Sequence, residues 1–200
     1  MARTRSSEPL LPWRALLADV WDTMAVDAAA ESMLWADCLL PEVERDRSAV
    51  FSPLGEARFM LGLETIYEGY LVHYGRPRLF APADDDTALL LGDYLYAHGV
   101  ARISALHEVA AVADLSELIS LCSQLRAEEA EEAASVPGAP GDGPLWAATA
   151  ALLGRGALDD ARTALRLHSD PRPLDAAARA AAGDDAVDSA LADHARRRAA

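Results

Sequence analysis

The chain has 200 residues, which suits one domain or at most two, and 43 of them are Ala and 29 are Leu. Because β-branched and aromatic residues are sparse, this composition excludes a β-sandwich or a β-barrel and favours helices. The formal net charge of −14 excludes a general nucleic-acid binder, because neutralising phosphates requires a cationic surface.

A long helix is predicted from Pro12, which suits a first helical turn, to about Leu40, and Pro41 ends it. Apolar residues recur along it at intervals of three or four, as on one buried face: Trp13, Leu16, Leu17, Val20, Trp21 and Met24. A second helix is predicted from Ser52-Pro53, a cap followed by proline, to Gly75.

A third helix is predicted after the acidic cap at residues 84–86, and a fourth from about Val112 to Ala134. Gly92 and Gly99 lie within the third helix, where each glycine costs about 1 kcal/mol relative to alanine. They are seven residues apart and share one stripe. We therefore expect another backbone to approach this helix closely.

The clearest interruption is the segment SVPGAPGDGP at residues 135–144, which holds three prolines and three glycines. It predicts a linker or an exposed loop. On this reading, residues 1–134 form a main helical bundle and residues 145–200 a helical C-terminal appendage.

The two cysteines, Cys38 and Cys122, are predicted to be buried free thiols, with a bridge between them as the alternative. Neither has partners spaced for a thiolate metal centre. The N-terminal segment has no secretory pattern, and no apolar run reaches the ~20 residues that a membrane span needs. We therefore expect a cytoplasmic protein without a membrane span.

Two carboxylates on the second predicted helix repel each other. Glu64 and Glu68 are an i, i+4 pair of like charges, and their neighbours are apolar. No base on the same helix compensates them. An arginine from another element, a metal ion or water must do so.

The segment that follows resembles a signature of the trans-polyprenyl diphosphate synthases. The resemblance rests on Gly75-Arg76-Pro77, a short acidic loop, and the run from Thr87 to Ala97 that contains Leu-Gly-Asp-Tyr-Leu. Aligned on Gly75 and Pro77, the family's DDxxD magnesium motif falls on Glu64-Thr65-Ile66-Tyr67-Glu68. The resemblance covers residues 59–132. It implies a diphosphate or metal relic formed by Glu64, Glu68, Asp93 and Arg76.

The departures from that family point away from catalysis. Thr65 replaces an acid, His73-Tyr74 replaces a pair of arginines, and the chain has no lysine to bind a second diphosphate. No counterpart of the second aspartate-rich motif is evident. A literal DDxxD begins at Asp184, but acids at the start and Arg196–Arg198 at the end are typical of a helix charged to suit its dipole.

The resemblance therefore implies an all-α fold, a shortened isoprenoid-synthase-like bundle, similar to the small non-catalytic subunits of heterodimeric hepta- or hexaprenyl diphosphate synthases. Such a chain would dimerise with a polyprenyl synthase-type helical protein through the region of Gly92 and Gly99 and shape the product tunnel. It would have no catalytic residue and no cofactor, with Mg²⁺ only if the family's site still worked.

Three alternatives remain open. One is a divergent enzyme that ionises an allylic diphosphate with Mg²⁺ at Glu64, Glu68 and Asp93. Another is a helical interaction module without an isoprenoid link. The third is a homodimeric protein that binds a lipid or isoprenoid ligand.

Overall fold

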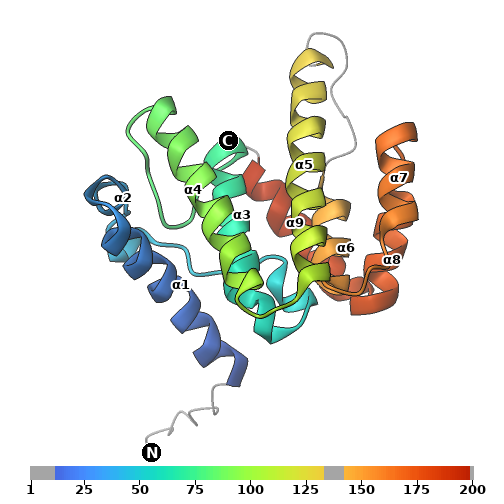
Figure 1. Ribbon diagram of the computed structural model, residues 1–200, viewed down its shortest axis with the longest axis horizontal. Helices are drawn as coiled ribbons and strands as arrows, with labels where there is room; N and C mark the ends of the chain where they lie inside the picture. Colours follow the sequence, from blue (N-terminus) through green and yellow to red (C-terminus); the bar gives the residue numbers. More distant parts are fainter. Residues whose placement is uncertain (1–11, 133–141, 199–200) are drawn as a thin grey trace, which may run out of the picture.

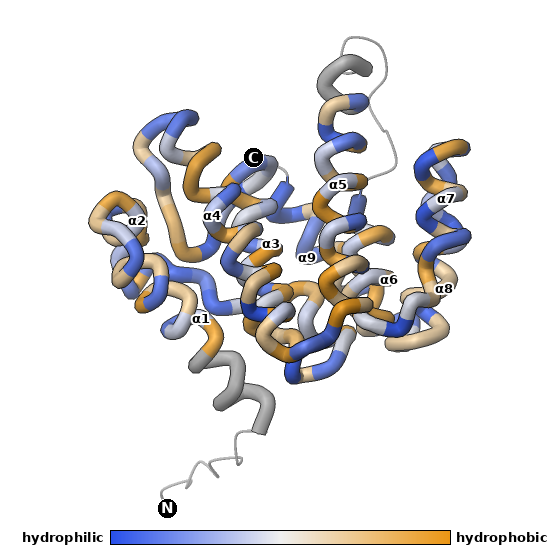
Figure 2. Tube along the Cα trace, viewed as in Figure 1, coloured by the Kyte–Doolittle hydropathy of each residue, from blue (hydrophilic) through white to orange (hydrophobic). Residues whose placement is uncertain are grey.

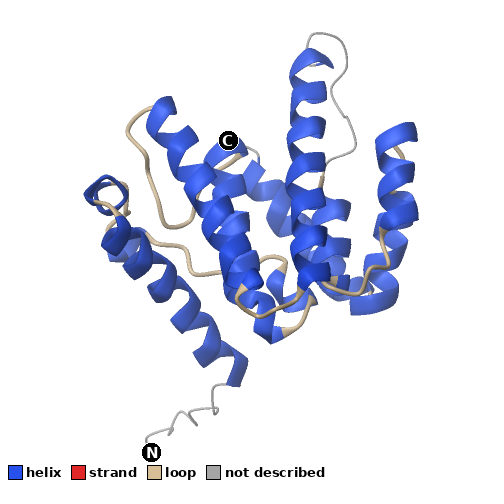
Figure 3. Ribbon diagram, viewed as in Figure 1, coloured by secondary structure: helices blue, strands red, loops and turns tan. Residues whose placement is uncertain are grey.

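The computed structural model describes residues 12–132 and 142–198. These residues form helices joined by turns (Figures 1 and 3), with one isolated antiparallel bridge between Leu39 and Phe80 and no strand. The prediction of an all-α fold is confirmed for this part of the chain. The α-helices are α1 (Pro12–Glu31), α2 (Met33–Asp37), α3 (Met60–Tyr74), α4 (Asp85–Ser104), α5 (Val109–Glu132), α6 (Gly143–Leu152), α7 (Asp159–His168), α8 (Arg172–Ala182) and α9 (Asp184–Arg198).

The first predicted helix is divided in two. Ser32 has extended backbone angles (φ −155°, ψ 139°), and its hydroxyl accepts the backbone N–H of Leu34 at the start of α2. The prediction of one helix to Leu40 is therefore wrong beyond Glu31. A serine that caps a new helix competes with continuation of the old one.

The second predicted helix starts later than Ser52-Pro53 indicates. Two short 3₁₀ turns, Ser52–Leu54 and Ala57–Phe59, precede α3, which begins at Met60. Between the turns, a Cβ on Gly55 would lie 2.2 Å from the carbonyl oxygen of Ala150. The backbone of α6 therefore approaches this segment too closely for a side chain, a contact that local sequence does not reveal.

Helix α3 lies at the centre of the molecule, and every residue from Gly62 to Val72 is buried. Its backbone packs directly on α4. A Cβ on Gly99 would lie 2.8 Å from the carbonyl oxygen of Gly62, and one on Gly69 would lie 2.9 Å from that of Gly92. The predicted close approach is confirmed, and its partner is α3. Gly92 and Gly99 are thus buried within the chain and are not a surface for a second subunit.

The C-terminal helices share the core of α3. The indole of Trp146 in α6 lies 5.0 Å from the ring of Tyr67, 5.3 Å from that of Tyr70 and 5.7 Å from that of Phe51, measured between centroids. Figure 1 shows α9 returning behind α5 to the middle of the molecule. The buried residues of the C-terminal helices therefore belong to the same hydrophobic core as α3 and α5, whereas α1 packs in a second cluster with part of α4.

Helix α7 lies at the periphery, and Figure 2 shows hydrophilic residues along most of it. One buried ion pair holds it: Nη1 of Arg162 is 2.7 Å from Oδ1 of Asp114 in α5. The outer helix is thus fastened by charge as well as by its apolar side.

Three smaller predictions can be compared with the structure. Asp84 caps α4 through the N–H of Thr87, and α9 begins at Asp184 and carries arginines in its last turn, as expected. Asp184 and Asp188 form ion pairs with Arg179 of α8. Cys38 and Cys122 are free and buried. No described helix is both long and apolar enough to cross a membrane.

Candidate functional site

Glu64 and Glu68, the conflicting pair, lie side by side on α3 and are almost completely buried, at 1% and 0% exposure. Both bind Arg78, which lies just after the turn that ends α3. Its Nη1 is 2.7 Å from Oε2 of Glu64, and its Nε is 2.9 Å from Oε2 of Glu68. Of the three ways to relieve the like charges, the structure shows an arginine from another element.

The remaining carboxylate oxygens of Glu64 and Glu68 also accept hydrogen bonds. Oε1 of Glu68 accepts the backbone N–H groups of Arg78 (2.7 Å) and Leu79 (2.8 Å). Oε1 of Glu64 accepts the backbone N–H of Ser52 at 3.3 Å. All four carboxylate oxygens thus have a protein donor, and each carboxylate ties α3 to a loop.

The guanidinium of Arg78 also contacts two aromatic rings. Its guanidinium carbon lies 4.4 Å from the ring centroid of Trp21 in α1 and 4.9 Å from that of Tyr67 in α3. Burial alone would lower the pKa of Arg78, but the charges of Glu64 and Glu68 outweigh burial and raise it. The guanidinium therefore stays charged between two aromatic faces, where cation–π attraction adds to the ion pairs.

Asp93 does not join this cluster. It lies on α4 with a mostly exposed side chain, and its Oδ1 is 3.3 Å from Nε2 of His73. Burial lowers the pKa of His73, and the charge of Asp93 only partly opposes that shift. The structure brings Glu64 and Glu68 together but leaves Asp93 on a separate surface.

A magnesium site at Glu64, Glu68 and Asp93 would need the three carboxylates to face one space with free oxygens. In the structure, two are buried and fully hydrogen-bonded, and the third faces solvent elsewhere. Among the described residues, no group of three or more His, Cys, Asp or Glu side chains is arranged to hold a metal ion. The described geometry therefore leaves no free group of carboxylate ligands for the metal site that the family resemblance implied.

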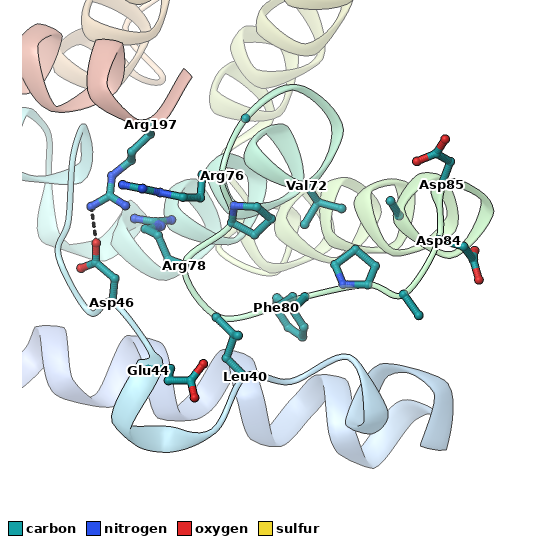
Figure 4. A pocket seen from close by; sticks show the side chains of 16 residues that line it. Leu40, Glu44, Asp46, Val72, Arg76, Arg78, Phe80, Asp84, Asp85 and Arg197 are labelled. Atoms are coloured by element: carbon teal, nitrogen blue, oxygen red, sulfur yellow. Dashed lines mark hydrogen bonds and ion pairs between the residues drawn. The ribbon is translucent and has the colours of Figure 1, made fainter. Parts of the chain in front are cut away.

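Arg76, the fourth predicted site residue, lies in the turn between α3 and Arg78. Its backbone N–H donates to the carbonyl oxygen of Arg197 at 2.9 Å, which brings the turn against the end of α9. Its side chain is exposed and lines a groove of about 700 Å³ (Figure 4). Arg76 therefore lies next to Arg78 in the chain, but it belongs to a surface groove rather than to the buried cluster.

The comparisons with known proteins add no relative. No protein-family model matches the sequence. No curated protein or solved structure matches it either. The resemblance in residues 59–132 thus remains a prediction to be tested on the protein itself.

Sequence reasoning missed Arg78. It ended the turn at Pro77 and assigned no role to the residue after it. The available signal was the combination of two uncompensated glutamates and a basic residue ten positions after Glu68. Only the direction of the turn, which folds Arg78 back onto α3, reveals that they meet.

A second buried polar network was not predicted from the sequence. Nδ1 of His194 is 2.9 Å from the hydroxyl of Tyr67, and its Nε2 is 3.0 Å from Oδ1 of Asp142. Asp142 is also 2.6 Å from Nη2 of Arg126. Burial would raise the pKa of Asp142, but the hydrogen bond and charge of His194 and the charge of Arg126 lower it. All three members of the Tyr67–His194–Asp142 chain are almost fully buried, so this network fastens α9 to the core.

Proposed function

We propose that this chain is a non-catalytic subunit that pairs with a complete polyprenyl diphosphate synthase-type protein and helps to shape its product tunnel. One observation carries the proposal. Glu64 and Glu68, in the register of the family's metal motif, have their oxygens occupied by Arg78, Leu79 and Ser52. A chain that resembles the family but uses these acids internally is suited to a structural role in the assembly.

The catalytic alternative receives less support. Metal-assisted departure of diphosphate needs cations held by several free carboxylates. Asp93 is paired with His73 on another surface, and the carboxylates of the other two acids bind Arg78. We therefore expect the chain alone to lack prenyl transfer activity.

The subunit contact has to use a surface other than Gly92 and Gly99. On α4, the same helix, Leu89 and Leu90 are each 56% exposed. Adjacent exposed leucines are candidates for burial in a protein interface. We assign the predicted partner contact to this end of α4.

The first experiment measures activity. The purified chain is incubated with isopentenyl diphosphate, an allylic diphosphate and Mg²⁺, alone and together with a full-length synthase subunit from the same source. We expect no elongated product from the chain alone and longer or more abundant product from the mixture. Elongation by the chain alone, or a mixture no different from the full-length subunit, would overturn the proposal.

The second experiment measures association. A double variant, Leu89→Glu with Leu90→Glu, is compared with Val43→Glu, which replaces an apolar residue exposed at 93% on a different element. We expect only the α4 variant to lose co-purification with the synthase subunit. Equal retention by both variants would rule out this contact surface.

A further inference from the structure

A groove lies between the end of α9, the segment from Gly75 to Ala88 and the loop from Leu40 to Asp46. It has a volume of about 700 Å³, and a smaller hollow of about 380 Å³ adjoins it. Arg76, Arg197 and Asp46 line both, so the two hollows share one junction. Figure 4 shows the side chains of Arg76, Arg78 and Arg197 gathered at this end of the groove.

The cations at the junction are unequally compensated. Glu64 and Glu68 bind Arg78, and Asp46 binds Arg197 with a 2.7 Å contact. Among the arginines whose side chains the structure describes, Arg76 is the one whose side chain makes neither an ion pair nor a hydrogen bond. Guanidinium groups repel one another at close range unless an anion lies near them. The junction therefore offers one uncompensated positive charge in an otherwise acidic protein.

Arg197 supplies a second feature of a binding site. The residue is only 8% exposed, and its Nε is buried without a hydrogen-bond partner. Its Nη2 is taken by Asp46 and by the hydroxyl of Ser48. Because that Nε has no exposed surface, a ligand in the groove meets the positive charge of Arg197 and not this N–H.

The remainder of the groove differs from its cationic end. Val72, Phe80, Leu40 and Pro82 line it, and the carboxylate of Glu44 lies beside Leu40. Asp84 and Asp85, at the start of α4, form its far end. A ligand that fits would carry negative charge only at the end with Arg76 and Arg197, because Glu44, Asp84 and Asp85 repel an anion elsewhere in the groove.

We propose that this groove binds a small phosphate monoester, with its phosphate at Arg76 and Arg197 and an apolar body along the wall toward Asp84. Guanidinium groups match phosphate because they donate parallel N–H bonds to two of its oxygens. The ligand site adjoins the Glu64–Glu68–Arg78 cluster through Arg78, which lines the groove, but it does not depend on the proposed subunit role.

The test is isothermal titration of the full chain with three probes: inorganic phosphate, n-octyl phosphate below its micellar concentration, and neutral octyl glucoside. We expect octyl phosphate to bind about tenfold or more tightly than inorganic phosphate, because it also buries its alkyl chain. Octyl glucoside is expected to bind far more weakly. Equal affinity for octyl phosphate and either of the other probes, or no binding of octyl phosphate, would overturn the proposal.

Variants test the phosphate-binding end of the groove and its apolar wall separately. Arg76→Gln removes an exposed charge and is expected to weaken octyl phosphate about tenfold or more, the usual effect of losing a charged hydrogen bond. Ala81→Gln, which adds a neutral polar side chain at an exposed lining position, is expected to weaken octyl phosphate but not inorganic phosphate. Arg172→Gln, on the exposed start of α8, is the control and is expected to bind like the parent. Unchanged affinity of Arg76→Gln for octyl phosphate would refute the site.

Discussion

Arg78 holds the carboxylate of Glu68 with both its backbone and its side chain: the backbone N–H reaches Oε1 at 2.7 Å, and Nε reaches Oε2 at 2.9 Å. This double contact closes the turn between α3 and α4 onto α3 itself. Because Arg78 also binds Glu64 and the carbonyl oxygen of Ser48 (3.0 Å), it joins α3 to the segment before Ser52. The pair is thus a structural fastening at the centre of the fold.

Replacing Arg78 tests this role. Arg78→Gln leaves two buried carboxylates without a countercharge, and we expect the free energy of unfolding to fall by about 3–5 kcal/mol, as measured by chemical denaturation. Arg172→Gln, at an exposed position, is expected to change it by less than about 0.5 kcal/mol.

The triple variant Arg78→Gln, Glu64→Gln, Glu68→Gln is the matched rescue. Because it removes all three charges, we expect it to regain part of the stability that Arg78→Gln loses. A triple variant that is less stable than Arg78→Gln would show that uncompensated charge is not the cause.

The contact between α3 and α4 gives the second prediction. In an exposed helix, Gly→Ala gains about 1 kcal/mol. At Gly99, however, the new Cβ would lie 2.4 Å from Cγ1 of Ile66 and 2.8 Å from the carbonyl oxygen of Gly62. We expect Gly99→Ala to lower the free energy of unfolding by about 1–3 kcal/mol, because the helices would have to separate.

Gly92→Ala is the comparison within the same helix. The nearest atoms to its Cβ belong to the imidazole of His73, the end of a side chain that can turn away. We expect a smaller loss than for Gly99→Ala in the same denaturation experiment. The reverse order would contradict the assignment of Gly99 to the tighter contact.

The pKa of Asp142 predicts how stability depends on pH. Burial opposes the shift, but contacts with His194 and Arg126 hold the pKa of Asp142 below its ordinary value of 3.8. A lowered folded-state pKa contributes stability that is complete above the unfolded value and is lost as pH falls through the folded value. We therefore expect the free energy of unfolding to drop below about pH 4.

Asp142→Asn removes this contribution. The variant should be less stable at pH 7 by about 3 kcal/mol, and its stability should change less than that of the parent below about pH 4. Asp185→Asn, on the exposed first turn of α9, is the control that should keep the parent's pH profile. Parallel profiles for Asp142→Asn and the parent would refute the assignment.

The core shared by both parts of the chain gives the last prediction. Trp146→Ala removes an indole that contacts Phe51, Tyr67 and Tyr70, and we expect a loss of about 3–5 kcal/mol in one cooperative transition. Leu167→Ala, on the outer side of α7, is expected to cost less than about 0.5 kcal/mol. Separate unfolding transitions for the N-terminal and C-terminal helices would show that the core is not shared.

Several features could be predicted because their causes are local. Asp84 caps α4 through neighbouring backbone groups, and the charges of α9 follow its own dipole. The stripe of Gly92 and Gly99 predicted that another backbone packs closely on this helix, because glycine destabilises a helix interior and is otherwise unfavourable there. The sequence could not identify α3 as that backbone, and the family resemblance had implied a partner protein at this stripe.

The starts and ends of helices were harder to predict where distant segments meet them. The segment from Ser52 to Phe59 forms 3₁₀ turns because the backbone of α6 passes beside Gly55, almost a hundred residues away along the chain. The position of Arg78 depends in the same way on the turn at Pro77. Such contacts are set by packing, which local propensity does not encode.

The sequence by itself determined that this protein is helical and that Glu64 and Glu68 need an outside charge, because composition and the i, i+4 spacing act locally. Only the tertiary structure decided that Arg78 supplies that charge, that Asp93 lies apart, and that Arg76 meets Arg197 at a groove. The physical reason is that ion pairs and grooves form between side chains brought together by folding, whatever their separation along the chain.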